Sequence, residues 1–375
     1  MVLAGKLYFA EDDTGTHLTQ THHNTMAATA AQSCQMIARG FLDVWRSGGN
    51  QWFMDLFGEG EHRDPEIMAT IDQLAAFAEH HLDDRRSTAE IAVFFSDTSL
   101  SYAKTNNFLT GNLIKQQLNE IAAIGASADV FRIEDLPELV RQNRLAQYKF
   151  AIMLNVHVIA DKVRALVETH LKAGRRTILW FHAPGIIHHG RFSPERSNEL
   201  TGIHCVMQTG GRASLITEVR IDGRRFSYGT QRNVFPRLVA ADPQATSLGY
   251  LVEGTWTPFR EGSDGATLAM REFPDFRSVW SSSPNMPSEL LAMFAEQAGV
   301  HLYCRCGSQV FNAANWLAVH AKWDGELDIR FPEKVTLRDA FTGDTVAVDT
   351  DRVRRTARRG ENLVFELDRN PRGSR

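Results

Sequence analysis

Between residues 88 and about 222, short apolar runs alternate with segments whose apolar residues recur at helical spacing. The apolar runs are residues 91–95, 129–133, 150–158 and 177–181, and the helical patterns are residues 107–124, 136–144 and 160–173. Continuous apolar strands that alternate with helices are typical of a parallel sheet with helices on both faces. This zone therefore predicts a doubly wound α/β domain.

The first part of the chain has the pattern of two consecutive strand–helix units. We expect strands at residues 6–10 and 51–56, and helices at residues 25–46 and 65–82. Gly48 and Gly49 would end the first helix, while Asp64 would cap the second helix with Pro65 at its first position. Two such units are too few to close a sheet by themselves.

The last part of the chain has the pattern of a small antiparallel β-sandwich. Residues 223–275 are rich in Gly, Pro and Arg, and few elements can be placed there. A helix is expected at residues 287–299, followed by short strands at residues 300–306, 310–315, 316–321, 327–330, 335–339, 345–348 and 363–367. Turn signals such as Trp323-Asp-Gly325 separate several of these strands, which favours hairpins.

Composition and charge narrow the classes of protein. The chain has 375 residues, of which 43% are hydrophobic and 23% charged, as in ordinary globular proteins with room for two or three cores. A net charge of -4 gives no electrostatic reason to expect nucleic acid or an anionic membrane as a partner. No signal-peptide pattern and no long apolar run is found, so we expect a cytoplasmic protein.

The doubly wound zone carries no recognisable catalytic motif. Neither a G-x-G-x-x-G nor a P-loop follows any of its strands, which removes the usual basis for nucleotide binding. No nucleophile stands at a strand-to-helix elbow, and Cys205 has no elbow around it. His182, His188 and His189 lack accompanying carboxylates, so we expect no metal and no cofactor. A scaffold or oligomerisation role is the better interpretation of this zone.

The richest chemistry lies at the start of the chain, where the apolar run 7–10 leads into Glu11, Asp12 and Asp13. His17 follows four residues later, and the second expected strand carries Trp52 and Asp55. Carboxylates beside an aromatic face are what glycosidic-bond hydrolysis requires. The alternative is structural: the acidic run caps the following helix and Trp52 fills a core.

The order of the segments and several local phrases resemble the C-terminal portion of the β-galactosidases of glycoside hydrolase family 42. Residues 6–17 are similar to the seventh strand of their (β/α)8 barrel, and residues 51–57 to the eighth. Segments 91–97, 148–155, 177–185 and 199–203 are similar to the flavodoxin- or class I glutamine-amidotransferase-like trimerisation domain. Segments 299–303, 331–333 and 339–343 are similar to the C-terminal β-sandwich.

The resemblance implies four parts: a barrel remnant (1–85), the trimerisation domain (86–225), an irregular connecting region (226–285) and the β-sandwich (286–370). It also implies a retaining hydrolase in which Glu11 is the nucleophile. The residues expected to bind the carbohydrate substrate are Asp12, Asp13, His17, Trp52 and Asp55.

The family's acid/base glutamate lies on the fourth barrel strand, which has no counterpart in this chain. We therefore expect a C-terminal fragment that is inactive alone and forms a homotrimer. The alternative is a non-catalytic trimerisation module.

A barrel remnant also poses a packing problem. Two barrel strands and their helices cannot bury their apolar faces without the other six. We expect Phe41, Trp45, Phe53 and Phe57 to be exposed or to pack on the α/β zone, which would favour aggregation.

Overall fold

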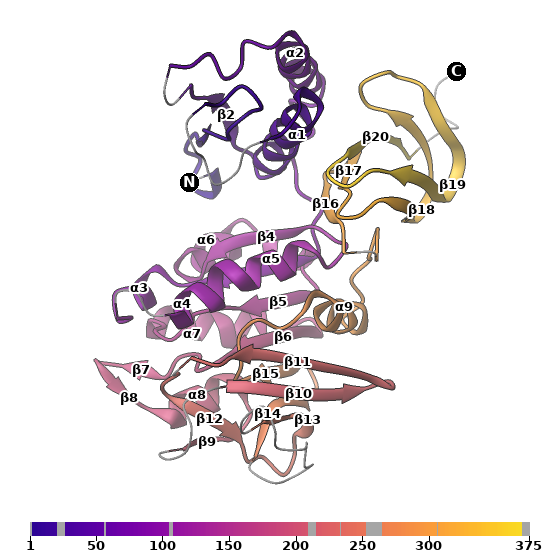
Figure 1. Cartoon of the computed structure of the whole chain (residues 1–375). Coiled ribbons are helices and arrows are strands. Elements are labelled where there is room, and N and C mark those ends of the chain that lie inside the picture. Colours follow the sequence, from indigo (N-terminus) through magenta and orange to yellow (C-terminus); the bar gives the residue numbers. More distant parts are fainter. Residues whose placement is uncertain are drawn as a thin grey trace. The chain divides into compact units, whose positions relative to one another are not determined.

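The computed structural model of the chain describes residues 2–20, 27–55, 58–104, 108–208, 215–232, 234–252, 265–305 and 307–369. The chain divides into two compact units. The terminal unit combines Met1–Ala89, Gly125–Ser127 and His301–Arg375, and the α/β unit combines Glu90–Ile124 and Ala128–Val300. Figure 1 labels the helices and strands of both units.

The α/β unit is built on an 11-stranded mixed sheet whose parallel part follows the predicted pattern. β3 (Ile91–Phe95) lies between β4 (Ala128–Arg132) and β5 (Phe150–Met153), and β6 (Arg176–Phe181) pairs with β5. All these pairs are parallel. Nearly every side chain of β3, β5 and β6 is buried, which explains why the apolar runs were readable in the sequence.

Helices connect the parallel strands and cover the sheet. The helices of this unit are α3 (Asp97–Leu100), α4 (Phe108–Gly111), α5 (Gln117–Ala122), α6 (Leu136–Arg141), α7 (Asp161–Leu166), α8 (Pro194–Thr201) and α9 (Ser288–Gln297). A π-helical segment, Asn112–Gln116, joins α4 to α5. The sequence pattern at 107–124 thus corresponds to one helical stretch with a wider turn inside it.

The region 226–285, expected as an irregular connection, holds much of the antiparallel part of the sheet. Its strands are β11 (Arg224–Thr230, which begins just before it), β12 (Arg237–Ala240), β13 (Thr246–Leu251), β14 (Ala266–Glu272) and β15 (Phe276–Ser281). The sheet is completed by β9 (Cys205–Gln208) and β10 (Leu215–Ile221), and a separate two-stranded sheet is formed by β7 (Ile187–His188) and β8 (Arg191–Phe192).

The sequence pattern did not predict β15, because serines occupy buried positions of this strand. This strand pairs in parallel with β6, yet it carries the polar residues Ser278 and Ser281 at fully buried positions. Ser278 Oγ accepts a hydrogen bond from Trp180 Nε1 at 3.0 Å, and Ser281 Oγ lies 2.9 Å from the Tyr228 hydroxyl. Tertiary partners satisfy these hydroxyls, so a run that is not continuously apolar still forms a central strand.

The terminal unit contains two sheets. β1 (Phe9–Asp12) and β2 (Asn50–Phe53) form a two-stranded parallel sheet, connected by α1 (Ala30–Arg46). α2 (Pro65–His80) follows, and the expected cap is confirmed because the Asp64 carboxylate accepts a hydrogen bond from Glu66 N. In the part of the chain that the structure describes, no further strand extends this sheet and no closed barrel is formed.

The second sheet is antiparallel and has five strands in the order β16-β17-β20-β18-β19. They are β16 (Gln309–Asn312), β17 (Trp316–His320), β18 (Gly325–Asp339), β19 (Thr345–Ala357) and β20 (Asn362–Asp368). Their side chains alternate between two cores, with Trp316 and Ala318 on one face and Leu317 and Val319 on the other. The expected antiparallel β structure is present, but as one five-stranded sheet and not as a sandwich of two sheets, and the described residues 300–305 form no strand of it.

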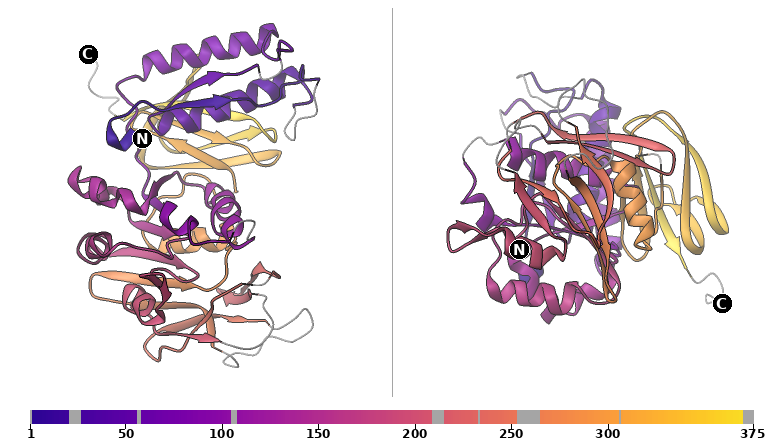
Figure 2. Two further views of the ribbon diagram at one scale, coloured as in Figure 1. Left: turned by 90° about the vertical axis from the view of Figure 1, so that its left-hand side faces the viewer. Right: turned by 90° about the horizontal axis from the view of Figure 1, so that it is seen from below.

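The expected packing of the N-terminal aromatic residues was wrong. Phe41 and Trp45 are buried and Phe53 partly buried, in one core with Phe311 and Trp316 of the antiparallel sheet, not with the α/β zone. Phe57 lies outside the described residues. Figure 2 shows the indigo helices of the terminal unit beside the yellow strands. The antiparallel sheet therefore covers the apolar faces of α1 and α2.

None of the helices among the described residues is long and apolar enough to cross a bilayer.

Replacing Leu42 with alanine tests this shared core. Leu42 is fully buried on α1, so Leu42→Ala is expected to lower the free energy of unfolding by about 2–5 kcal/mol. Leu7→Ala is the matched control, because Leu7 is 76% exposed and its loss is expected to change the free energy by less than about 0.5 kcal/mol. Urea denaturation measures both values. Hydrogen exchange should then show α1 and β17 losing protection together, and unchanged protection of β17 would contradict the shared core.

Candidate functional site

The two-stranded sheet brings Glu11 and Trp52 side by side. They are paired positions of the parallel strands β1 and β2, each one residue before the end of its strand. Paired positions place their side chains on the same face of a sheet, about 5 Å apart. Glu11 is exposed, and Trp52 is 43% exposed. A carboxylate and an indole face therefore meet the solvent together at the carboxyl end of two parallel strands.

Asp12 lies on the opposite face and is held by the fold. Only 7% of Asp12 is exposed, and its carboxylate accepts hydrogen bonds from Thr14 N at 3.0 Å and Gln51 Nε2 at 2.5 Å. Gly40 of α1 faces Asp12, because a Cβ added to this glycine would be in van der Waals contact with Asp12 Oδ2 at 3.5 Å. These contacts assign Asp12 a role in joining β1, β2 and α1.

His17 and Asp55 also have structural partners. His17 Nδ1 lies 3.0 Å from Ser33 Oγ, and His17 Nε2 lies 3.4 Å from the carboxylate of the α2 cap Asp64. The Asp55 carboxylate accepts hydrogen bonds from the backbone N–H groups of Glu59 and Gly60 at 2.9 and 2.7 Å. These bonds order the loops after β1 and β2.

Asp13 is exposed beside the strand end. The resemblance implies six site residues. The structure pairs Glu11 with Trp52 and exposes Asp13 just after β1, whereas Asp12, His17 and Asp55 have partners within the protein.

A buried acid that the sequence did not single out lies in the same loops. Glu61 is fully buried, and no described group donates a hydrogen bond to either of its carboxylate oxygens. Its carbonyl accepts a hydrogen bond from Thr16 Oγ1 at 2.6 Å, which ties the loop after β2 to the loop after β1. Burying an unpaired carboxyl group is costly, so this position is a candidate for a functional role.

In the α/β unit, side chains close the carboxyl ends of the parallel strands. Asn155 accepts a hydrogen bond from Ser96 N at 2.9 Å and donates one to Ser96 O at 3.1 Å, so it links the ends of β3 and β5. Ser96 Oγ donates to the Glu134 carboxylate at 2.8 Å. Both Ser96 and Asn155 are buried, and this edge, where such sheets usually bind ligands, is occupied by the protein's own groups.

His182, one of the three histidines singled out in the sequence, is 1% exposed. It follows β6 with a φ of 62°, and its Nε2 lies 2.7 Å from Pro236 O. A carbonyl can only accept, so Nε2 carries the proton and Nδ1 accepts from His157 Nε2 at 3.2 Å. Burial lowers the pKa of His182 to about 4, because the charged imidazolium would lose its hydration.

Cys205 has no features of a nucleophile. Its thiol is buried on β9, and burial, with the nearby Asp242 carboxylate, raises its pKa far above the usual range. A thiolate is therefore strongly disfavoured at neutral pH.

Comparison with known proteins gives a likeness of fold. No protein-family model matches the chain, and no curated protein matches it in sequence. Among solved structures, the β-galactosidase from Bacillus circulans sp. alkalophilus superposes with a TM-score of 0.60 at 15% identity, over 85% of this chain and 50% of that one. The β-galactosidase from the psychrophilic Marinomonas ef1 gives a TM-score of 0.60 at 12% identity, over 97% and 53% of the two chains.

A third similar structure is α-L-fucosidase isoenzyme 2 from Paenibacillus thiaminolyticus, with a TM-score of 0.50 at 12% identity, over 90% of this chain and 56% of that one. This chain thus spans about half the length of each of these enzymes. The fold of the described residues is glycoside-hydrolase-like at low identity.

Sequence reasoning missed groups that tertiary structure assembles. No metal site was expected, yet His80, His81 and Glu366 lie close together. The adjacent histidines were visible in the sequence, but Glu366 is near the other end of the chain and no spacing rule connects it to them.

The buried His182 makes the α/β unit sensitive to acid. In the unfolded chain a histidine takes up a proton near pH 6.5, whereas folded His182 resists protonation until about pH 4. The neutral His182 side chain therefore makes its full contribution to the free energy of unfolding above pH 6.5. That contribution is lost as the pH falls from 6.5 toward about 4. Between about pH 7.5 and about pH 5 the loss attributable to His182 is about 2 kcal/mol.

Urea denaturation at these two pH values measures the effect. Asparagine tolerates a positive φ and keeps an N–H donor. His182→Asn is therefore expected to reduce the change in the free energy of unfolding between the two pH values by that amount. An unchanged pH dependence in His182→Asn would contradict the assignment.

Proposed function

We propose that this chain is part of a β-galactosidase-like glycoside hydrolase, and that Glu11 and Trp52 form one side of its sugar site. The observation that carries the proposal is the register of β1 and β2, which pairs these two exposed side chains at the carboxyl ends of parallel strands. In βα-barrels that end of the strands is where catalytic residues stand. The glycoside-hydrolase-like fold of the described residues supports the same interpretation.

The proposed chemistry is retaining hydrolysis. Glu11 would attack the anomeric carbon, and the indole of Trp52 would pack against the apolar C–H face of the sugar. Asp13 is exposed and follows Glu11 by two residues, so its carboxylate would accept hydrogen bonds from hydroxyl groups of the sugar. A retaining enzyme also needs a general acid about 5–5.5 Å from the nucleophile. The resemblance puts that glutamate on a barrel strand that the described residues do not form.

We infer that the 375-residue chain alone binds sugar weakly and does not turn it over. Saturation-transfer NMR with a β-galactoside is expected to give signals that Trp52→Ala abolishes. Trp323→Ala is the matched control, because Trp323 is also exposed, at 57%, but lies in a turn of the antiparallel sheet. Equal signals from the two variants would contradict a sugar site at Trp52.

Hydrolysis of a nitrophenyl β-galactoside tests the catalytic half of the proposal. We expect no turnover above that of Glu11→Gln, because only one carboxylate of the pair is supplied. Turnover by the wild-type chain that Glu11→Gln removes would show that the chain holds a complete site.

A second candidate function is oligomerisation through the α/β unit. Two aromatic side chains of this unit, Phe192 at 50% and Phe235 at 65% exposure, stack edge to face with ring centroids 5.5 Å apart. Exposed apolar side chains that gather in a patch are typical of an interaction surface. Together with the resemblance to a trimerisation domain, this patch supports a homotrimer.

Sedimentation at micromolar concentration tests this second function. The wild-type chain is expected to sediment as a trimer, and Phe192→Ser is expected to shift it toward the monomer. Tyr102→Ser, which removes another exposed aromatic ring (54% exposed) of the same unit, serves as the control. A wild-type monomer would contradict the trimer.

A further inference from the structure

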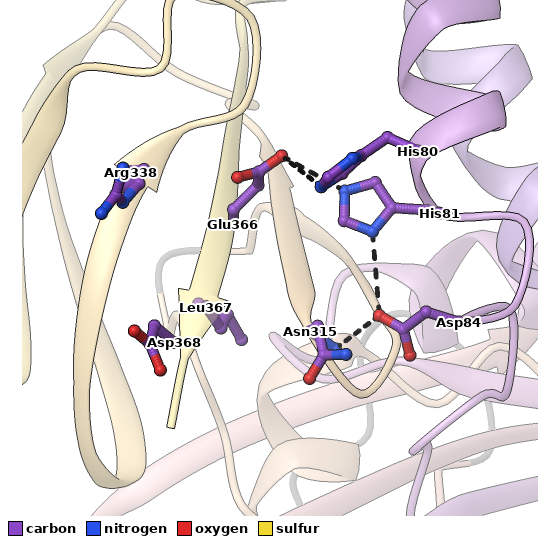
Figure 3. A pocket seen from close by; sticks show the side chains of 8 residues that line it. All are labelled: His80, His81, Asp84, Asn315, Arg338, Glu366, Leu367 and Asp368. Atoms are coloured by element: carbon purple, nitrogen blue, oxygen red, sulfur yellow. Dashed lines mark hydrogen bonds and ion pairs between the residues drawn. The ribbon is translucent and has the colours of Figure 1, made fainter. Parts of the chain in front are cut away.

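A cavity of about 230 Å³ lies within the terminal unit, between the end of α2 and the strand β20. Figure 3 shows the side chains that line it. His80 is the last residue of α2 and His81 is its C-cap, while Glu366 projects from β20 toward both imidazole rings. Three potential ligands from two distant segments of the chain thus point at one another.

The distances from Glu366 to the two histidines are close to those between ligand atoms around a bound metal ion. Glu366 Oε1 lies 3.6 Å from His80 Nε2 and 3.5 Å from His81 Nε2. One ligand atom from each of the three residues lies within 4.8 Å of the others. These separations are too long for hydrogen bonds. A tetrahedral ion with bonds of about 2.0–2.1 Å holds its ligand atoms about 3.3–3.4 Å apart, close to the two distances from Glu366 Oε1. The two histidine nitrogens, within 4.8 Å of each other, would move closer together on binding.

His81 is a buried side chain whose Nε2 contacts Glu366 as an ion pair but makes no hydrogen bond within the described part of the chain. It is 4% exposed, and its Nε2 has no hydrogen-bond partner among the described residues. A buried polar atom without a partner costs free energy, and such atoms in native proteins call for an explanation. This nitrogen faces the cavity next to Glu366, so a ligand in the cavity would satisfy it.

The far side of the His81 ring faces a second carboxylate. Its Nδ1 lies 3.8 Å from Asp84 Oδ2, and the same oxygen accepts a hydrogen bond from Asn315 N at 3.0 Å. The ring also packs on Phe77, with 4.4 Å between the ring centroids. At 3.8 Å the Asp84 carboxylate is beyond hydrogen-bond distance of Nδ1 and places negative charge beside the ring, while the packing on Phe77 fixes the ring's orientation. A small shift on metal binding would bring this carboxylate into the outer-partner position that metal-binding histidines usually have.

The local charge also favours a cation. The carbonyl groups at the C-terminal end of α2 carry partial negative charge, and Glu366, Asp84 and Asp368 line the same cavity. Arg338 is the basic residue of the lining, and in Figure 3 its side chain lies beyond Glu366, away from the two histidines.

We propose that His80, His81 and Glu366 bind a divalent transition-metal ion, best fitted by Zn²⁺, that fastens the end of α2 to β20. Two imidazole nitrogens and one carboxylate oxygen are a known ligand set for tetrahedral zinc, with water as the fourth ligand. The ion joins a helix from the N-terminal part of the chain to a strand from its C-terminal part. Binding to the folded state alone stabilises the terminal unit in proportion to the logarithm of the metal concentration.

The proposal is tested by titrating the chelator-treated, tag-free chain with Zn²⁺ in a calorimeter. We expect saturable binding that His80→Ala and Glu366→Gln each weaken more than about tenfold, since even loss of an outer partner costs 10–100-fold. His80 is exposed, so His80→Ala should fold normally, which circular dichroism of the metal-free protein checks. His170→Ala, which removes an exposed histidine of the α/β unit, is the matched control and should bind Zn²⁺ like the wild type.

Two further measurements identify the site. Co²⁺ should give the intense visible absorption of a tetrahedral complex in the wild type but not in His80→Ala. Zn²⁺ should raise the Tm of the wild type and of His170→Ala by equal amounts, and raise that of Glu366→Gln less at the same Zn²⁺ concentration. Absence of saturable binding, or binding that His80→Ala and Glu366→Gln leave intact, would overturn the proposal. His22 and His23 are another pair of adjacent histidines in the sequence. Binding that disappears only when these two are both replaced would overturn the proposal as well.

Discussion

The terminal unit depends on burying the apolar faces of α1 and α2 against one face of the antiparallel sheet. Ile37 and Leu42 of α1 are almost completely buried in a core that also contains Phe311 and Trp316. Hydrophobic burial of this kind is worth about 1.5–3 kcal/mol for each large side chain. Hydrogen bonds add specificity. Asn362 at the start of β20 donates its backbone N–H to Gln35 Oε1 of α1 at 2.8 Å, and its side-chain amide donates to Gln35 O and Oε1 at 2.7 and 2.8 Å.

The candidate sugar site rests on this packing. β1 and β2 make only a two-stranded sheet, and such a sheet is marginally stable without a further layer. Their connection, α1, is anchored by the antiparallel sheet, and Asp12 ties β1 to Gln51 of β2. Glu11 and Trp52 can therefore hold a fixed relation to each other although both are exposed. The cavity beside His81 lies at the edge of the same core, where Phe77 contacts both His81 and Trp316.

The α/β unit uses its buried polar groups differently. Hydroxyl, amide and imidazole side chains close the ends and interior of its sheet with mutual hydrogen bonds, as with Asn155 at Ser96 and His182 at Pro236 O. Such satisfied groups support a unique packing, but they leave little room for a ligand among themselves. The exposed aromatic pair Phe192 and Phe235 lies instead on the surface of this unit.

The sequence by itself determined the elements whose signal is local. The apolar runs of β3, β5 and β6 and the Asp64 cap of α2 could be predicted because continuous burial and capping leave a pattern within a few neighbouring residues. The proximity of Glu11 and Trp52 could also be predicted from the sequence, because consecutive parallel strands that pair place their carboxyl ends together. Tertiary structure alone decided the role of β15, whose buried serines depend on distant partners, and the choice of the antiparallel sheet as the surface that covers α1. It also decided the meeting of His80 and His81 with Glu366, because contacts between opposite ends of a chain leave no periodicity in either segment.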